Sequence, residues 1–270
     1  MTWLPFASYN LWSLFAPAVG QENWHCDMKR GFTKARGKET AIAQILKQDN
    51  IPQRIGHLAQ RGVYEFHQDN SMLNRSNAVQ IIAETLQLNQ EKEEVQERVR
   101  LILRKYQENP ILKDKHIIHL THGDEGFPQP IQIQQGNYLF NLYAAIDCIF
   151  TEDDILHILD FKTGKTDFDF RQGFVYLLAV SYLYPKLPAI ASFYNLETGK
   201  WSKPISATVS QLKAVQIEIV QIAKKHQHDL QQYRENVEAF NQIFPPNPGI
   251  QCQYCQFKSV CSFSKIEVTA

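Results

Sequence analysis

Two kinds of hydrophobic pattern divide this chain into segments. Residues 138–150 and 156–162 are apolar almost throughout, as expected for strands that are buried on both faces. Residues 151–154 between them are polar and predict a turn, so the two runs should pair as an antiparallel hairpin. Residues 132–134 precede the hairpin and complete a predicted meander of three strands. Residues 191–196 predict a further strand.

Apolar positions with helical spacing flank these strands on both sides. They predict helices over seven ranges: 8–15, 39–48, 53–66, 75–88, 91–107, 167–183 and 210–240. Ser210 is a favourable N-cap for the last helix, and a proline-rich segment beginning at Pro245 ends it. Strands enclosed by helices in this way predict an α/β protein.

The composition is ordinary for a soluble globular protein, with 44% hydrophobic and 21% charged residues. The formal net charge is zero, so any surface for a nucleic acid must be local. One local patch of basic residues lies near the N-terminus, and a solvated loop and a phosphate-facing loop explain it equally well. Its members are Lys29, Arg30, Lys34, Arg36 and Lys38.

The first 20 residues are apolar, but no basic segment precedes them, and prolines and polar residues interrupt the run at Pro5, Asn10, Ser13 and Pro17. We therefore expect neither a secretory signal nor a membrane span, but a segment that packs into the core. A membrane-surface anchor is the alternative. The expected compartment is the cytoplasm, where clustered cysteines bind metals more often than they form disulfides.

Charged residues mark the ends of the two apolar runs. Asp147 lies close to the end of the first run, and Asp160 and Lys162 lie at the end of the second. Because side chains alternate along a strand, Asp160 and Lys162 should project to one side, about 7 Å apart. The hairpin would bring Asp147 towards them, forming a site for a hard divalent cation and a phosphate. The alternative is that both aspartates are turn or capping residues and Lys162 is solvated.

Three of the five cysteines fall within ten residues of the tail: Cys252, Cys255 and Cys261. Such thiolates are predicted metal ligands. Structural zinc sites usually use two close pairs of ligands, whereas three ligands with a distant fourth occur in several iron–sulfur sites. Cys26 is the expected fourth ligand, with His25 as a substitute, and Cys148 is expected to be a buried core thiol. Such a metal would tie the two chain ends together.

The histidines are weaker candidates. His116, His119 and His122 recur at every third position, but residues 117–121 fit a short strand better, and residues three apart on a strand face opposite ways. His57, on the predicted helix 53–66, is by itself an ordinary core or surface histidine.

Together, these residues resemble the RecB-like branch of the PD-(D/E)XK nuclease superfamily. In particular they look like its iron–sulfur members, the AddB-type nucleases and the CRISPR-adaptation exonucleases. Asp147 matches the aspartate of the family's first catalytic strand, and Asp160 to Lys165 matches its Asp-x-Lys-Thr-Gly signature. Gln172 and Tyr176 match the Gln-x-x-x-Tyr motif of the next helix.

Two further features belong to the same resemblance. His57, directly after Gly56, falls where these enzymes place a metal-binding histidine on an early helix, and Cys26 with the tail trio matches the family's one-plus-three cysteine arrangement. The sequence also departs from the family. Ala144 and Ala145 replace the usual glycine before the first aspartate, and Glu65 is only a distant match to the acidic residue that often follows the histidine.

The resemblance implies a restriction-endonuclease-like α/β fold: a mixed β-sheet core flanked by helices, with a helical N-terminal region and cysteine-clamped termini. It implies one nuclease domain over residues 1–270, with a helical insertion at about 67–110 and an iron–sulfur module formed by residues 20–34 and 248–264.

The implied activity is metal-dependent hydrolysis of DNA phosphodiester bonds, as an exonuclease acting on single strands or ends. The implied ligands of Mg²⁺ or Mn²⁺ are His57, Asp147, Asp160 and the Phe161 carbonyl, with Lys162 orienting water or stabilising charge. A 4Fe–4S cluster, or zinc as the alternative, would be held by Cys26, Cys252, Cys255 and Cys261. The nucleic acid would be positioned by Gln172, Tyr176, Lys29 and Arg30.

Two other functions compete with this interpretation. One is a non-catalytic DNA-binding or adaptor protein that retains the fold and the cluster, and the other is a zinc-clamped protein of unrelated function. The chain lacks helicase motifs, so a helicase would be a separate partner, as would a CRISPR-adaptation protein.

Overall fold

The computed structural model describes residues 4–17, 20–48, 50–69, 71–123, 128–164 and 168–265. The chain divides into two compact units. We call Asp49–Pro130 with Tyr143–Val215 the central unit, and Met1–Gln48 with Ile131–Leu142 and Gln216–Ala270 the terminal unit. The single domain, the insertion and the iron–sulfur module expected from the sequence stay predictions.

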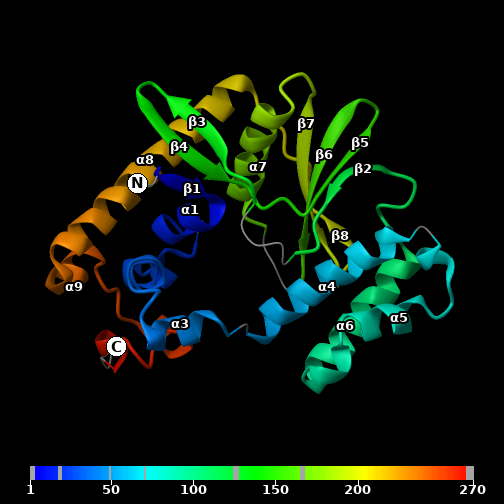
Figure 1. Cartoon of the computed structure of the whole chain (residues 1–270), viewed down its shortest axis with the longest axis horizontal. Coiled ribbons are helices and arrows are strands. Elements are labelled where there is room, and N and C mark those ends of the chain that lie inside the picture. The colour runs from blue at the N-terminus through cyan, green and yellow to red at the C-terminus, as the bar shows by residue number, and fades with distance from the viewer. Residues whose placement is uncertain are drawn as a thin grey trace. The chain divides into compact units, whose positions relative to one another are not determined.

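The central unit is built on a mixed sheet whose strands lie in the order β2-β5-β6-β7-β8 (Figure 1). β6 and β7 pair in parallel, and the other neighbours are antiparallel. The strands are β2 His116–Leu120, β5 Cys148–Glu152, β6 Ile155–Lys162, β7 Ala189–Asn195 and β8 Lys200–Trp201.

Helices cover both faces of this sheet. Leu159 and Phe161 of β6 pack into a core with the three helices of one face, whereas Leu156 and Ile158 pack with the single helix of the other face. The three helices are α4 Ile51–Gln68, α5 Ala78–Thr85 and α6 Glu93–Glu108, and the single helix is α7 Phe170–Leu183. Burial on both faces explains why β6 lacks an alternating polar pattern.

The terminal unit contains a smaller sheet in the order β1-β4-β3. Its strands are β1 Phe6–Ser8, β3 Ile131–Gln135 and β4 Tyr138–Tyr143. The long helix α8, Val209–Glu235, contacts the β3–β4 hairpin from Gln216 onwards. There Gln216 Nε2 donates to Gln135 Oε1 at 2.7 Å, and the Tyr138 hydroxyl donates to Gln227 Oε1 at 3.2 Å.

A second core in the terminal unit joins its N- and C-terminal segments. Phe32, Phe240, Phe244 and Phe257 are buried against one another, and Gly31 is required there because a Cβ at this position would lie 2.7 Å from the Phe244 ring. The helical elements around this core are α1 Tyr9–Phe15, α2 Asp27–Arg30, the π-turn Gly31–Ala35, α3 Thr40–Leu46, α9 Phe240–Ile243, and the 3₁₀ turns Ile250–Tyr254 and Ser262–Lys265.

Four further 3₁₀ turns complete the described secondary structure: Glu22–Trp24, Met72–Asn74, Leu88–Gln90 and Val237–Ala239. The expected packing role of the N-terminal segment is confirmed, since Leu11 and Trp12 of α1 are buried. Within the described ranges, each helix is too short or too polar to cross a bilayer.

The prediction of a single strand over residues 138–150 is wrong. β4 ends at Tyr143 and β5 begins at Cys148, and the two belong to different sheets, so the expected three-stranded meander does not form. The apolar run continues without a break because Ile146, in the connection, is itself buried in the core. The hairpin of β5 with β6 is confirmed.

The predicted bounds of the last long helix, residues 210–240, are wrong at both ends. It begins at Val209 and not after Ser210, because the Thr208 hydroxyl accepts from Gln211 N while Gln211 Oε1 accepts from Thr208 N, which is a capping-box arrangement. It ends at Glu235, after which the Asn236 side chain caps a separate turn. Residue 167, where the α7 prediction began, lies outside the described residues.

Candidate active site

Asp160 lies near the end of β6 and is held by residues of α7. Its carboxyl is nearly inaccessible, with 3% of the residue exposed. Oδ1 accepts a hydrogen bond from Gln172 Nε2 at 2.8 Å and lies 2.8 Å from the Tyr176 hydroxyl, while Oδ2 forms an ion pair with the Lys162 ammonium. The two oxygens therefore face different partners.

Lys162 and Asp160 project from the same side of β6, as the alternation of side chains predicts. Lys162 Nζ also donates to Gln172 Oε1 at 3.0 Å, and 27% of its side chain is exposed. Gln172 and Tyr176 share a face of α7 because they are four residues apart. The Tyr176 hydroxyl additionally lies 2.5 Å from the Ala145 carbonyl, so the α7 pair joins β6 to the segment before β5.

Asp147 stands directly before β5, with both carboxylate oxygens engaged. Oδ2 accepts from the Phe161 backbone N–H at 2.7 Å, and Oδ1 accepts from Gln60 Nε2 at 2.9 Å. The Asp147 carbonyl accepts from Thr121 N at 2.9 Å, which fixes the backbone as well. Asp147, Asp160 and Lys162 are thus brought together at one end of the sheet.

Burial and the nearby Asp160 raise the pKa of Asp147 well above its usual range, although Lys162 and the hydrogen bonds from Phe161 and Gln60 oppose the shift. Burial, followed by the charges of both aspartates, also raises the pKa of Tyr176 well above its ordinary value, so its hydroxyl keeps its proton. With both carboxylates ionised, two negative charges face one ammonium, and the group carries a net charge of −1. This surplus favours the binding of a cation.

Gln60 was not predicted from the sequence. It lies on α4, and its Nε2 donates to Asp147 Oδ1 and to Thr121 Oγ1, both at 2.9 Å. The signal in the sequence was its position three residues after His57, which places both on one face of the helix. Gly56 also shows that α4 lies close to the end of β6. A Cβ at this position would lie 3.4 Å from Oγ1 of Thr163, the residue that follows Lys162 in the sequence.

His57 is exposed on α4, one residue after the glycine that approaches Thr163. Within the described ranges, no three His, Cys, Asp or Glu side chains are grouped closely enough to hold one metal ion. The role of His57 as a ligand beside Asp147 and Asp160 therefore stays a prediction. The same holds for the Phe161 carbonyl, while Lys165 of the predicted signature lies outside the described residues.

The four predicted cluster ligands lie around one pocket in the terminal unit. Cys26, Cys252, Cys255 and Cys261 all line it, together with Met28, Phe32 and Phe257 among others. The Asn247 backbone N–H donates to Cys26 Sγ at 3.4 Å. Burial raises the pKa of Cys261, and the neighbouring Cys255 and Cys26 act in the same direction.

The two other sets of candidate ligands behave as the sequence indicates. Cys148 is fully buried, and burial together with Asp147 raises its pKa to about 12, so it is a core thiol. His116 and His119 lie on β2, which confirms that this segment is a strand.

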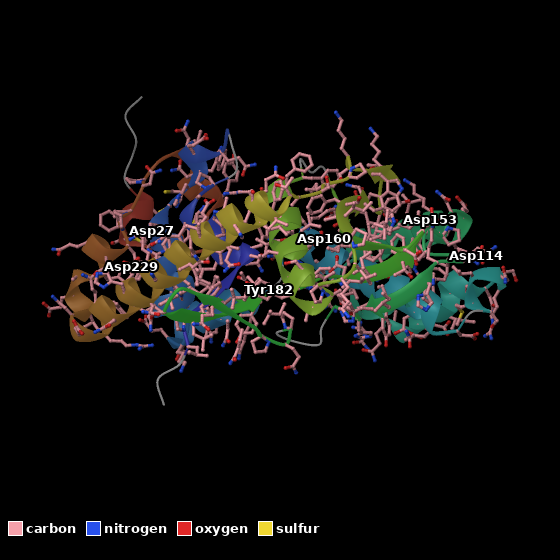
Figure 2. The ribbon with its side chains drawn as sticks, turned by 90° about the horizontal axis from the view of Figure 1, so that it is seen from above. Asp27, Asp114, Asp153, Asp160, Tyr182 and Asp229 are labelled. Atoms are coloured by element: carbon pink, nitrogen blue, oxygen red, sulfur yellow. The ribbon has the colours of Figure 1, made fainter. Side chains whose placement is uncertain are left out.

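Arg30 corrects the predicted basic patch. It is fully buried, with its guanidinium bound to Asp27 at 2.6 and 2.7 Å and to Asp229 Oδ2 at 2.8 Å. Figure 2 shows the two aspartates next to each other, from α2 and α8. Arg30 therefore cannot reach a nucleic acid, and its predicted positioning role is wrong. Lys29 is half-buried beside the cysteine pocket, and its role stays a prediction.

Comparisons with known proteins identify a family for this chain. Residues 34–262 match the family model described as the PD-(D/E)XK nuclease superfamily. No curated protein matches the chain. A solved structure described as a "Putative exonuclease" from Eubacterium rectale is 13% identical, covers 82% of each chain and gives a TM-score of 0.46. The structure of SSO0001 is also 13% identical, covering 76% of this chain and 94% of its own, with a TM-score of 0.30.

Proposed function

Because the chain belongs to the PD-(D/E)XK nuclease superfamily, we propose that it is a divalent-metal-dependent nuclease that hydrolyses DNA at the Asp147–Asp160–Lys162 site. The observation that carries the proposal is the convergence of these side chains. Asp147 is bonded to the Phe161 backbone, and the Asp160–Lys162 ion pair flanks that residue on β6. The mixed α/β fold, with helices on both faces of the sheet, is consistent with the restriction-endonuclease-like fold of this superfamily.

The donor chemistry fits Mg²⁺ or Mn²⁺, since both ions prefer carboxylate oxygens. Asp147 and Asp160 would hold the ion, with His57 and the Phe161 carbonyl as further ligands. When bound, the ion would polarise the scissile phosphate and lower the pKa of water so that a nucleophile is available near neutral pH. Its charge would also offset the surplus negative charge of the two carboxylates.

The protein groups around this site have separate tasks. Gln172 and Tyr176 hold Asp160 Oδ1, which leaves Oδ2 directed at the Lys162 ammonium. Lys162 is partly exposed, and its ammonium would stabilise the negative charge that grows on the phosphate oxygens as water forms the new P–O bond and the old one breaks. We propose that Lys29 contacts a phosphate at another point along the DNA strand.

The substrate we propose is single-stranded DNA or a DNA end, cut by an exonuclease. This can be tested with end-labelled single-stranded and duplex DNA, with Mn²⁺ or with excess chelator. We expect degradation only with the metal, and none by Asp160→Asn. Equal degradation by wild type and by this variant would trace the activity to a contaminant and remove the support for the proposal.

A non-catalytic DNA-binding protein with the same fold is the competing function. It predicts DNA binding without metal-dependent cleavage, so the same assay separates the two. The intact set of Asp147, Asp160, Lys162, Gln172 and Tyr176, with its internal hydrogen bonds, favours the enzyme.

We further propose that Cys26, Cys252, Cys255 and Cys261 hold a 4Fe–4S cluster, with zinc as the alternative. The pocket that all four cysteines line supports the proposal, and loading the cluster would have to draw the thiols closer together, since within the described ranges no three of them are grouped closely enough to hold one metal ion. Such a cluster would connect segments more than 200 residues apart, and closing so long a loop is worth on the order of 5 kcal/mol in the simple cross-link model.

The visible absorption of anaerobically purified protein separates a brown iron–sulfur protein from a colourless zinc protein. Cys26→Ser should fold poorly and lose the colour. A soluble, coloured Cys26→Ser protein would remove Cys26 from the ligand set, and a colourless wild type containing zinc would favour the zinc clamp. A helicase or a CRISPR-adaptation protein is proposed as a separate partner.

A further inference from the structure

Two exposed aromatic side chains lie beside the cysteine pocket of the terminal unit. Trp24 is 48% exposed and Tyr254 is 76% exposed, although large aromatic groups are usually more deeply buried. Trp24 precedes Cys26 by two residues, and Tyr254 lies between Cys252 and Cys255. Segments from the two ends of the chain thus present one ring each.

The two rings are neighbours. Their centroids are 6.3 Å apart and their planes are inclined by 43°, so the flat faces are not stacked on each other. Each ring belongs to a short 3₁₀ turn, Glu22–Trp24 or Ile250–Tyr254. The exposed pair therefore offers flat ring surface that the two rings do not cover by stacking on each other.

Hydrogen bonds connect the two segments that carry the rings. Asn247 Nδ2 donates to the His25 carbonyl at 2.7 Å, and Gln251 Nε2 donates to the Asn247 carbonyl at 2.8 Å. These bonds join the residue after Trp24 to the turn that contains Tyr254. The arrangement is preorganised, which lowers the entropic cost of binding a ligand.

A lysine ammonium accompanies each ring. Lys29 Nζ donates to the Trp24 carbonyl at 3.3 Å, and Lys258 Nζ donates to the Gln253 carbonyl, next to Tyr254, at 3.5 Å. Glu22, in the same turn as Trp24, accepts a hydrogen bond at Oε1 from the backbone N–H of Gly20 at 3.0 Å. Two aromatic faces with a cation beside each combine a surface for bases with charges for phosphates.

We propose that Trp24 and Tyr254 form a stacking platform for the bases of single-stranded DNA, with Lys29 and Lys258 binding the adjacent phosphates. The proposal rests on the proposed function in one respect, namely that single-stranded DNA is the substrate. The paired cations favour a nucleic acid over a protein partner, because an apolar protein contact would gain nothing from them. Base stacking on an aromatic side chain tolerates any sequence, which suits a nuclease that degrades DNA processively or from an end.

The test is the affinity of the full-length protein for a fluorescent thymidine oligonucleotide, measured by anisotropy with excess chelator so that no cleavage occurs. Trp24→Leu and Tyr254→Leu should each weaken binding roughly 5- to 150-fold, the range expected for losing one stacked base. Trp24→Phe should bind nearly as tightly as wild type, because it keeps an aromatic face. Equal losses in Trp24→Leu and Trp24→Phe would overturn the stacking assignment.

Trp201 provides a matched control. It is 47% exposed and lies 4.9 Å from the Tyr194 ring, but Tyr194 is buried and the pair belongs to the central unit. Trp201→Leu should leave DNA binding unchanged. If Trp201→Leu weakens binding as much as Trp24→Leu does, the loss is not specific to the platform and the proposal fails.

The lysines are tested through the salt dependence of binding. Lys29→Gln and Lys258→Gln should each reduce the slope of log K against log salt by about 0.7, as expected for one lost phosphate contact on a single strand. Unchanged slopes would overturn the phosphate part of the proposal.

The outcomes separate this proposal from the proposed nuclease. If Trp24→Leu binds DNA like wild type while wild type cleaves DNA with Mn²⁺, the platform fails and the nuclease stands. If Trp24→Leu loses affinity while wild type never cleaves, the platform stands and the nuclease fails. A wild type with no affinity for the oligonucleotide overturns the platform outright.

Discussion

Two clusters of charged side chains in this protein have a similar central arrangement and opposite consequences. In the central unit, Asp147 and Asp160 face Lys162; in the terminal unit, Asp27 and Asp229 face Arg30. Each cluster contains two carboxylates and one cation drawn from segments that are separated in the sequence. The clusters differ in their exposure and in their remaining charge.

The Arg30 cluster is neutral, and its central cation is buried. Arg30 has no exposed surface, its guanidinium lies 4.0 Å over the Phe15 ring, and Lys225 Nζ adds a second cation 3.2 Å from Asp229. In the Lys162 cluster the cation remains partly exposed, and the carboxylates outnumber it. The comparison indicates that an accessible central cation with a surplus of carboxylates marks the functional cluster, whereas a buried central cation with balanced charge marks the structural one.

The comparison is tested most severely by removing each cation. Lys162→Ala should lower the rate of Mn²⁺-dependent DNA cleavage by about 10²–10³-fold, because an electrostatic donor to the phosphate is lost. Because the buried Asp160 also loses its ammonium, the free energy of unfolding should fall as well, so cleavage is measured on protein shown by circular dichroism to be folded. The matched control, Lys113→Ala, removes an exposed lysine of the same unit and should retain full activity. Normal cleavage kinetics in Lys162→Ala would show that Lys162 has no part in cleavage, which contradicts the functional role of this cluster.

Arg30→Met should lower stability without removing a group from the proposed cleavage site. The buried Asp229 and the partly buried Asp27 would lose their guanidinium, and the free energy of unfolding should fall by about 3–5 kcal/mol, measured by urea denaturation. Arg75 pairs with Asp69 on the surface, so Arg75→Met should cost no more than about 1 kcal/mol. Equal small losses in both variants would show that the Arg30 cluster contributes no more than a surface pair.

The sequence predicted the functional cluster better than the structural one. Asp160, Lys162, Gln172 and Tyr176 lie on two regular elements whose periodicity fixes which side chains share a face, so local pattern was sufficient. Arg30 and Asp229 are 199 residues apart, and a basic residue among lysines gives no local sign that a distant aspartate encloses it.

Two further differences arise from tertiary contacts. The contact of Gln60 with Asp147 depends on how α4 packs against the sheet, which helical periodicity does not determine. The break between β4 and β5 was hidden because Ile146, in the connecting segment, is as apolar as the strands it separates. Ile146 is apolar because it is buried in the core, and not because it belongs to a strand.

Gln60 provides a further test of the functional cluster, because it orients the Asp147 carboxylate that would hold the metal. Gln60→Ala should weaken Mn²⁺ binding by about 10- to 100-fold, as expected for an outer partner of a metal ligand, with a similar loss of cleavage at low Mn²⁺. Saturating Mn²⁺ should restore most of the rate. Gln68→Ala, at the exposed end of the same helix, is the control. Calorimetry that shows the same Mn²⁺ affinity in both variants would exclude this role.

The last prediction concerns His226, which lies beside the Arg30 cluster and has no effect near neutral pH. It is buried, its ring contacts Phe6 and Phe15, and burial, with Arg30 and Lys34 acting in the same direction and Asp27 opposing, lowers its pKa to about 3. The folded state therefore binds a proton at His226 more weakly than the unfolded state does. Above pH 6.5 the imidazole is neutral in both states, so its lowered pKa does not change the stability of the protein there. Stability should fall by about 1.4 kcal/mol per pH unit as the pH drops from about 6 towards 3.

His226→Leu should remove this share of the acid sensitivity, which urea denaturation at several pH values can measure. Identical pH slopes in wild type and variant would show that His226 takes up its proton without penalty in the folded state.

The central claim is that Asp147 and Asp160 hold a divalent cation beside Lys162. The most direct test is to locate Mn²⁺ by anomalous diffraction from crystals of the protein grown with the metal. We predict a peak with oxygen atoms of both aspartates at about 2.0–2.3 Å. A peak elsewhere, with these two carboxylates unbound at saturating Mn²⁺, would contradict the claim.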